Sequence, residues 1–254
     1  MAKREKKDKG TVVQEIHSRI IWITAAGISA VIAVLTMLLL LTPEGRKSSV
    51  KLIQWWAGLL LKMAGVKTRG VGLDLLPGEG PAIFIANHQS VLDIPVVIAM
   101  LPAGVNMFAK RSLFKIPIFG WAMSAQGFIP VVRHSRSKAR QSLQPAERIL
   151  REGKQLFIFP EGTRSRTGEL GTFKTGAFRL GITTETPIVP LTLIGGDSIL
   201  PPRRRLIKRG RITMVVGEPI DTAGLELSDR HELRDRTWNW IAETKEYYSG
   251  KDSG

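Results

Sequence analysis

The chain has 254 residues, of which 37 are lysine or arginine and 22 are aspartate or glutamate, so its formal charge is +15. It has no cysteine, which excludes disulfides and thiolate metal ligands. The four histidines are scattered without the spacing of metal ligands, and we predict no metal site. This positive charge suits an anionic membrane surface, an acidic carrier protein or phosphate-bearing ligands, and it would suit nucleic acid equally.

The amino-terminal region predicts a membrane anchor. Residues 20–41 form an uncharged apolar run that would be roughly 33 Å long as a helix, enough to cross the hydrocarbon core of a bilayer. Residues 42–45 break this helix, and residues 50–62 follow with the pattern of a second, amphipathic helix. We therefore assign residues 1–65 to a basic tail and a two-helix membrane anchor.

Two arrangements of these helices fit the sequence. Basic residues flank the apolar run on both sides, at residues 3–9 and 46–51, so the positive-inside rule selects no orientation. The first helix either spans the membrane or pairs with the second in a hairpin held in one leaflet. We favour the hairpin, because basic flanks on both sides favour a common face and Trp55 and Trp56 suit the interfacial zone. A cleaved signal peptide is disfavoured, because the apolar run is too long and no small-residue cleavage site closes it.

The first candidate functional residue is His88, which follows a short buried strand at residues 82–86. Histidine titrates near neutral pH, so it can take a proton from a substrate hydroxyl. Asp93 can orient the ring and stabilise the imidazolium. One continuous helix would separate residues five apart by about 140°, so we predict His88 in a loop and Asp93 near a helix start. The alternative is an ordinary loop histidine followed by a helix-capping aspartate.

A second candidate site follows another apolar strand, at residues 155–159. Gly162 permits close approach to the backbone, and Arg164 carries a planar guanidinium that matches phosphate oxygens. Glu161 would orient that arginine or hold a substrate hydroxyl. The alternative is ordinary turn chemistry with a solvated arginine.

The chain from residue 66 to 254 alternates strands with helices. We predict strands near residues 82, 106, 128, 155, 188 and 211, and helices near residues 94, 118, 142, 174 and 228. This alternation is typical of one α/β domain with a single core. The densest basic patch, residues 203–211, lacks interleaved aromatic residues for base stacking, so we predict no nucleic-acid partner.

Four segments resemble, in order, the sequence blocks of the glycerolipid acyltransferase family: residues 87–93, 127–133, 159–165 and 188–191. The similarity is strongest to the 1-acylglycerol-3-phosphate (lysophosphatidate) acyltransferase branch and extends over residues 82–195. It implies an α/β domain with a mixed sheet flanked by helices, preceded by the membrane-anchoring hairpin. One position departs from the pattern, since Val132 stands where the family usually has an acidic residue before the arginine of its second block.

The resemblance also implies roles for individual residues. His88 and Asp93 would form the catalytic pair. The acceptor substrate would be bound by Lys110, Arg133, Glu161, Gly162, Thr163 and Arg164. No cofactor is implied beyond the acyl donor, acyl-CoA or acyl carrier protein, which is itself a substrate.

The activity that the resemblance implies is transfer of a fatty acyl chain from an acyl thioester to the sn-2 hydroxyl of lysophosphatidate, without an acyl-enzyme intermediate. The product would be phosphatidate for phospholipid synthesis. The expected partners are the two substrates, an anionic membrane surface and, as one of the two donors, acyl carrier protein. The expected location is the cell (inner) membrane, with the catalytic domain on the cytoplasmic face.

Other functions stay open at this stage. Glycerol 3-phosphate or another lysophospholipid is the alternative acceptor. A hydrolase would use His88 and Asp93 to activate water, and a membrane-tethered binding protein would use them for no chemistry at all.

Overall fold

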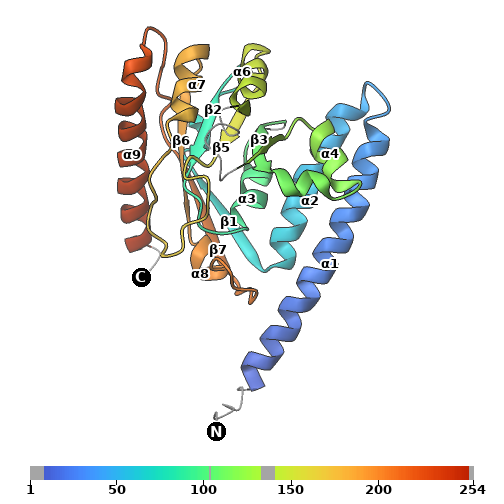
Figure 1. Cartoon of the computed structure of the whole chain (residues 1–254). Helices are drawn as coiled ribbons and strands as arrows, with labels where there is room; N and C mark the ends of the chain where they lie inside the picture. Colours follow the sequence, from blue (N-terminus) through green and yellow to red (C-terminus); the bar gives the residue numbers. More distant parts are fainter. Residues whose placement is uncertain (1–8, 103, 133–140, 252–254) are drawn as a thin grey trace.

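The chain folds into a seven-stranded sheet with helices on both faces (Figure 1). The computed structural model describes residues 9–102, 104–132 and 141–251. The strands are β1 (Val66–Val71), β2 (Ile83–Ala86), β3 (Asn106–Lys110), β4 (Ile129–Val131), β5 (Leu156–Ile158), β6 (Ile188–Ile194) and β7 (Gly210–Val216). Their order in the sheet is β1-β7-β6-β2-β5-β3-β4, and every neighbouring pair is parallel except β6 and β7. The predicted α/β fold with a mixed sheet is confirmed.

Helices connect most of these strands. The α-helices are α1 (Lys9–Leu39), α2 (Gly45–Met63), α3 (Asp93–Met100), α4 (Phe119–Ala125), α6 (Leu143–Arg151), α7 (Gly176–Thr184), α8 (Gly196–Ile199) and α9 (Arg230–Lys251). Short 3-10 helices lie at η1 (Leu73–Leu75), η2 (Arg111–Lys115) and η3 (Leu227–Asp229). Each predicted strand and helix of the domain is present. Strand β1 was not predicted, because Lys67 and Arg69 give this edge strand a polar composition that hides it from a search for apolar runs.

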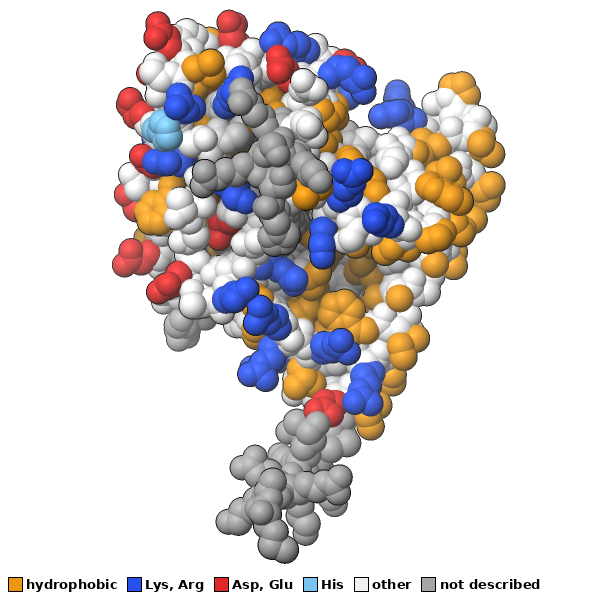
Figure 2. All heavy atoms as spheres, in the orientation of Figure 1, with side chains coloured by type: hydrophobic (Ala, Val, Ile, Leu, Met, Phe, Trp, Pro, Cys, Tyr) orange, Lys and Arg blue, Asp and Glu red, His pale blue; other side chains and the backbone are white. Residues whose placement is uncertain are grey.

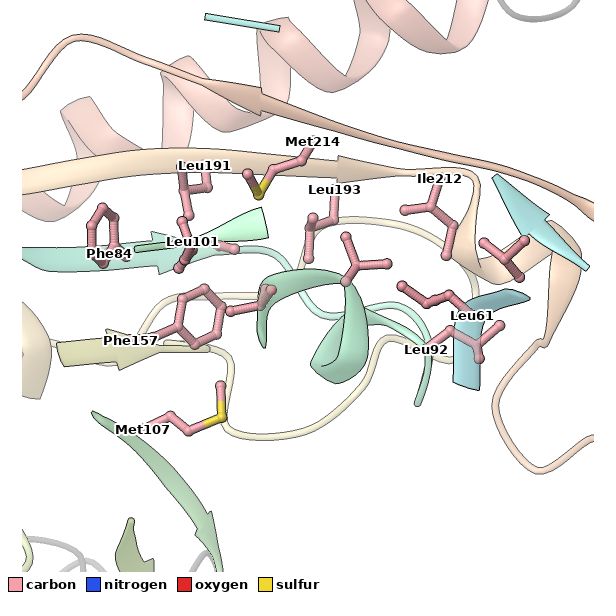
Figure 3. Close-up of a cluster of buried hydrophobic side chains, with 14 of the residues drawn as sticks. Leu61, Phe84, Leu92, Leu101, Met107, Phe157, Leu191, Leu193, Ile212 and Met214 are labelled. Carbon is pink, nitrogen blue, oxygen red and sulfur yellow. The ribbon is translucent and has the colours of Figure 1, made fainter. Parts of the chain in front are cut away.

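Two hydrophobic cores lie on opposite faces of the sheet, because successive strand residues point to opposite sides. Phe84 and Ala86 of β2 point into the core that includes α3, whereas Ile83 and Ile85 point toward α6 and α7. Figure 3 shows the first core, where side chains from the sheet meet Leu61 of α2 and the two residues that flank α3, Leu92 and Leu101. Strand β2 is therefore buried on both faces, which fixes the position of the loop that follows it.

The helices α1 and α2 lie side by side as a helical pair beside α3 and α4 (Figure 1). Among the described residues, one helix is long and apolar enough to cross a membrane, and it comprises Val13–Leu39 within α1. The two predicted helices are present, but α1 begins at Lys9 rather than residue 20, and α2 begins at Gly45 rather than residue 50. Both helices extend beyond the predicted segments, because the polar residues before each segment also form helical backbone hydrogen bonds.

One face of α1 contacts the rest of the protein along much of its length. The Ile207 N–H donates to Ser18 Oγ at 3.0 Å, and Trp22 Nε1 donates to the Arg205 carbonyl at 3.0 Å. Thr36, near the other end of the helix, is also buried. Large apolar side chains at helical spacing occupy the other face and are exposed: Val13, Ile16, Ile20, Ile23, Val31, Val34, Leu35 and Leu38.

Gly45 makes the tight turn between α1 and α2 possible, because a Cβ atom there would lie 1.7 Å from the carbonyl oxygen of Leu39. Gly45→Ala is expected to lower the free energy of unfolding by about 1–3 kcal/mol, since the added atom forces the backbone apart. Thermal unfolding in detergent, followed by tryptophan fluorescence, measures this loss.

Gly58→Ala is the matched control, in the same helical pair. Outside its own helix, no atom of the described residues lies within 4 Å of the Cβ position of Gly58. Alanine is favoured over glycine inside a helix, so this variant should be at least as stable as the wild type. Equal losses in the two variants would contradict the role of the turn.

Candidate functional site

The two sequence motifs meet at one edge of the sheet. Strands β2, β5 and β3 are parallel neighbours, so their carboxyl ends lie at the same edge. The loop of residues 87–92 follows β2, and the loop of residues 159–175 follows β5. This edge of a parallel sheet is where α/β proteins place binding and catalytic residues.

His88 and Asp93 form a buried pair. His88 Nδ1 lies 2.9 Å from Asp93 Oδ2, and the same oxygen accepts the N–H groups of Gln89 and Ser90, each at 2.7 Å. Asp93 is the first residue of α3, where the helix dipole also favours a negative charge. The predicted geometry, with a loop histidine beside an aspartate at a helix start, is confirmed. The turn between the two residues is what brings all three donors to one oxygen.

The imidazole ring of His88 lies in apolar surroundings. It stacks on Phe159 with ring centroids 3.9 Å apart and an interplanar angle of 12°, and Phe159 meets Phe157 edge-on at 4.6 Å. His88 is 3% exposed and Asp93 is 0% exposed. Because Nδ1 pairs with Asp93, Nε2 is the ring nitrogen that would exchange a proton with a substrate.

The backbone of His88 is held by the second motif. Its N–H donates to Glu161 Oε1 at 2.8 Å, and its carbonyl accepts the Ser165 N–H at 2.8 Å. These bonds join two segments that are far apart in the sequence. They fix where the imidazole sits relative to the loop after β5.

Glu161 links two loops rather than reaching outward. Its Oε1 accepts the His88 N–H, and its Oε2 accepts the Gly171 N–H at 3.1 Å. A Cβ at position 171 would lie 2.6 Å from Oε2, so Gly171 permits this close approach. Burial raises the pKa of Glu161 above the usual range of a glutamate, although both N–H donors favour its charged form. One carboxylate oxygen thus holds the backbone of His88, and the other holds the backbone of the loop after β5.

Further side chains that the sequence analysis missed support this site. Asn87 bridges to β6: its Nδ2 donates to the Leu193 carbonyl at 2.8 Å, and its Oδ1 accepts the Leu193 N–H at 2.7 Å. An asparagine directly after a buried strand was the available signal. The pairing with a residue so far along the chain has no local signature.

The carboxy-terminal helix α9 also holds the loop after β5. Trp238 Nε1 donates to the Gly171 carbonyl at 3.0 Å, and Lys245 Nζ donates to the Gly168 carbonyl. Gln89 Nε2 donates to that same Gly168 carbonyl at 3.1 Å, so α9 and the histidine loop meet at one oxygen. The sequence analysis predicted a helix here but gave it no role at the site.

Gly162, Thr163 and Arg164 lie on this loop, which is hydrogen-bonded to the backbone of His88. Gly162 has a φ of 72°, which favours glycine, and its N–H donates to the Phe159 carbonyl at 3.1 Å. Thr163 and Arg164 are exposed. A Cβ at Gly162 would lie 2.5 Å from Lys174 Nζ, so a second cation, which the sequence analysis missed, lies over this glycine.

The two other predicted acceptor residues, Lys110 and Arg133, do not belong to the loop after β5. Lys110 is the last residue of β3, at the same sheet edge, and is exposed. Arg133 lies outside the described residues, so its role stays a prediction.

An apolar pocket lies between α2, α3 and β3. Its lining is formed by Val50, Ile53, Gln54, Val97, Ile98, Leu101, Pro102, Gly104, Val105, Met107, Gln126 and Phe128. Met107 is in register with Phe157, whose ring touches Phe159 beneath His88. A continuous series of apolar side chains therefore connects the imidazole to the pocket.

Comparisons with known proteins identify the family. Residues 67–194 match the model of the family described as Acyltransferase. A chloroplastic 1-acyl-sn-glycerol-3-phosphate acyltransferase of Brassica napus is 33% identical over 227 residues, which are 86% of this chain and 64% of the relative. The human 1-acyl-sn-glycerol-3-phosphate acyltransferase beta is 31% identical over 205 residues, which are 80% of this chain and 74% of the relative.

A crystal structure supports the same fold. The 1-acyl-sn-glycerophosphate acyltransferase of Thermotoga maritima superposes with a TM-score of 0.83 at 23% identity, and the match covers 94% of this chain and 97% of that chain.

The chain therefore belongs to the acyltransferase family, as its sequence blocks predicted. The relatives named above and one from Arabidopsis thaliana carry the name 1-acyl-sn-glycerol-3-phosphate acyltransferase, which is the branch that the motifs resemble. The chain spans 64% of the length of the Brassica relative and 58% of the Arabidopsis relative.

Glu161→Gln tests the positioning role of Glu161. The glutamine side chain would turn its NH₂ group toward one of the two backbone N–H groups that Glu161 now accepts. Two donors would then face each other, so we expect a loss of about 1–3 kcal/mol in the free energy of unfolding. The loss should depend on pH. Because burial raises the folded-state pKa of Glu161, its contribution is fully present below the pKa of a glutamate in the unfolded chain and is lost as the pH rises through the folded-state value.

The difference in stability between wild type and Glu161→Gln should therefore shrink from acidic to neutral pH, as measured by urea unfolding at several pH values. Glu169→Gln, an exposed glutamate of the same loop, is the matched control and should change little. A difference that grows with pH would refute the assignment of a raised pKa.

Proposed function

We propose that the protein is a membrane-bound 1-acylglycerol-3-phosphate O-acyltransferase. It transfers a fatty acyl chain from an acyl thioester, acyl-CoA or acyl carrier protein, to the sn-2 hydroxyl of lysophosphatidate and releases phosphatidate. The observation that carries this proposal is the buried His88–Asp93 pair, hydrogen-bonded through the His88 backbone to the loop of the third sequence block. The names of the relatives support lysophosphatidate as the acceptor.

The reaction needs one base and no covalent intermediate on the protein. His88 Nε2 takes the proton of the acceptor hydroxyl while the hydroxyl oxygen attacks the thioester carbonyl carbon. Asp93 stabilises the imidazolium that forms. The tetrahedral intermediate then collapses, the carbon–sulfur bond breaks, and His88 returns the proton to the departing thiolate. The new ester and a free thiol remain.

Cations at the edge of the site bind the acceptor phosphate. Arg164 offers a bidentate guanidinium, and Lys174 lies over the neighbouring Gly162. Lys110, which is exposed at the end of β3 on the same sheet edge, is a third candidate. Arg133 would add a further cation, as the second sequence block implies. The phosphate therefore sits on the exposed side of the loop, away from the buried pair.

The oxyanion of the tetrahedral intermediate needs donors near His88. The Gly162 N–H already donates to the Phe159 carbonyl, so we assign this role to the next amide, that of Thr163. Glu161 acts indirectly, since its two oxygens hold the His88 and Gly171 amides.

The fatty acyl chain occupies the apolar pocket between α2, α3 and β3. Phe159 and Phe157 lead from the imidazole toward Met107, which lines that pocket. An acyl chain whose carbonyl carbon lies beside His88 would extend along these side chains toward the pocket.

The helical pair α1–α2 attaches the protein to one leaflet of the cell membrane, with the domain on its cytoplasmic face. Contacts of α1 with the domain at Ser18 and Trp22 support the hairpin rather than a spanning helix. The exposed apolar face of α1 would be covered by lipid.

His88→Ala tests the base. We expect phosphatidate formation to fall by about 10²-fold to 10⁴-fold, because the proton-transfer step loses its acceptor. Detergent-purified protein is incubated with lysophosphatidate and a palmitoyl thioester, and the lipid products are identified by mass spectrometry. His231→Ala, an exposed histidine on α9, is the matched control and should retain activity.

Full activity in His88→Ala would refute this mechanism. Loss of the thioester without phosphatidate in the wild type would indicate a hydrolase, and product only with glycerol 3-phosphate or another lysophospholipid would change the acceptor.

Arg164→Ala tests the phosphate site. The Michaelis constant for lysophosphatidate should rise by about tenfold or more, because a charge-assisted hydrogen bond is lost, while that for the acyl donor should change little. Steady-state kinetics with each substrate varied in turn separate the two constants. Arg179→Ala, an exposed arginine on α7, is the control. Equal increases for both substrates would contradict the assignment.

A further inference from the structure

The segment between β3 and α4 exposes large apolar side chains in a place where the proposed function gives them no role. Ile116 is 47% exposed, Ile118 is 40% exposed and Trp121 is 60% exposed. All three lie within six residues of chain that follow η2 and enter α4. Single exposed apolar residues are common on protein surfaces, but a cluster that includes tryptophan marks an interaction site.

Ile118 is also held in a strained backbone conformation. Its φ is 65° and its ψ is −58°, and the Phe119 N–H donates to the Pro117 carbonyl at 2.6 Å, which makes a γ-turn centred on Ile118. Positive φ is a genuine outlier for a β-branched residue. Such strain persists only where the surroundings impose it, and it clusters at functional positions.

The surroundings impose this turn. A Cβ at Gly120 would lie 2.3 Å from the Phe114 carbonyl oxygen, so the chain folds back tightly on itself. At the other end of α4, Gln126 Nε2 donates to Ser49 Oγ of α2 at 2.7 Å. The turn is therefore rigidly attached to the helical pair, and it presents Ile118 outward.

The exposed segment is continuous with the apolar face of α1. Helix α4 packs against α1, and the exposed residues Val31, Leu35 and Leu38 lie on the part of α1 nearest the turn into α2. Figure 2 shows hydrophobic side chains gathered on this side of the molecule, with Lys and Arg side chains bordering them.

The basic residues suit the polar edge of a bilayer. Arg111 and Lys115 of η2 are exposed directly before the apolar segment, and Arg46 and Lys47 are exposed at the start of α2. Basic side chains beside an apolar surface favour an anionic leaflet, because their stems cover apolar surface while their charges reach the headgroups.

We propose that residues 116–121 form a third membrane-inserting element, with an anionic phospholipid leaflet as its occupant. This inference rests on the proposed attachment of α1 and α2 to the membrane and adds a contact remote from them in the sequence. Insertion at three points fixes the tilt of the domain relative to the membrane. Insertion of the helical pair alone would leave the domain free to rotate about the axis of that pair. Lys110, directly before η2, is thereby held at the level of the lipid phosphates.

Spin labels test this insertion, and the absence of native cysteine makes single labels clean. The full chain carries one cysteine at a time, as Ile118→Cys, Leu38→Cys or Arg148→Cys, in vesicles of phosphatidylcholine and phosphatidylglycerol in equal amounts. Leu38 is on the apolar face of α1, and Arg148 is an exposed residue of α6. We expect labels at 118 and 38 to collide more with oxygen than with a water-soluble nickel chelate, and the label at 148 to do the reverse.

The outcomes are distinguishable. A label at 118 that behaves like the one at 148, with the label at 38 inserted, overturns this inference and leaves the proposed anchor intact. If the label at 38 is also in water, the anchor fails and the inference fails with it. Dipolar broadening between labels at 118 would show that a second copy of the chain covers the segment, which also overturns the inference.

Relief of strain gives an independent test that does not depend on a label. Ile118→Gly removes both the strain and the apolar side chain, so thermal stability in detergent should be unchanged or higher, while activity on vesicle-embedded lysophosphatidate should fall by about tenfold. Glu185→Gly, at another residue with positive φ, is the matched control and should not alter activity on vesicles. Unchanged vesicle activity in Ile118→Gly would overturn the proposal.

Discussion

The site depends on one buried oxygen, Asp93 Oδ2. A buried carboxylate is costly by several kcal/mol unless donors surround it, and here the imidazole and two backbone amides converge on the same atom. They converge only if the chain turns sharply after His88 and then starts α3. The contacts that offset the burial of Asp93 are therefore the contacts that orient the imidazole of His88. The first residue of α8 also makes room for this carboxylate, since a Cβ at Gly196 would lie 2.8 Å from Asp93 Oδ1.

The parallel sheet brings the second motif to this pair, and hydrogen bonds then set the distance between them. Glu161 and Ser165 hold the two backbone polar groups of His88, so the histidine cannot shift without moving the loop after β5. That loop is held in turn by Trp238 and Lys245 of α9. Helix α9 lies outside residues 67–194, the part that matches the family model. The position of His88 thus depends on a segment beyond the region that matches the family model.

Local signals explain what the sequence could predict. Short apolar runs gave the strands, the five-residue separation placed His88 in a loop and Asp93 at a helix start, and the block order gave the family. The missed features are all contacts between distant segments or polar edges. Nothing near Glu161 in sequence indicates that its partners are the amides of His88 and Gly171, and Lys174 approaches Gly162 only because the loop folds back. Strand β1 was missed because its polar composition, which suits the exposed edge of a sheet, gives no apolar run to detect.

The contacts of α1 constrain how the protein can meet a membrane. Ser18 and Thr36 are both buried against the protein, and along a helix they are about 27 Å apart, nearly the thickness of a hydrocarbon core. If α1 spanned the bilayer, the loop that contacts Ser18 and the helices that cover Thr36 would have to lie on opposite sides of it. A helical pair lying in one leaflet avoids this conflict. Because α2 belongs to that pair and also lines the apolar pocket through Val50 and Ile53, the pocket lies directly beside the helical pair.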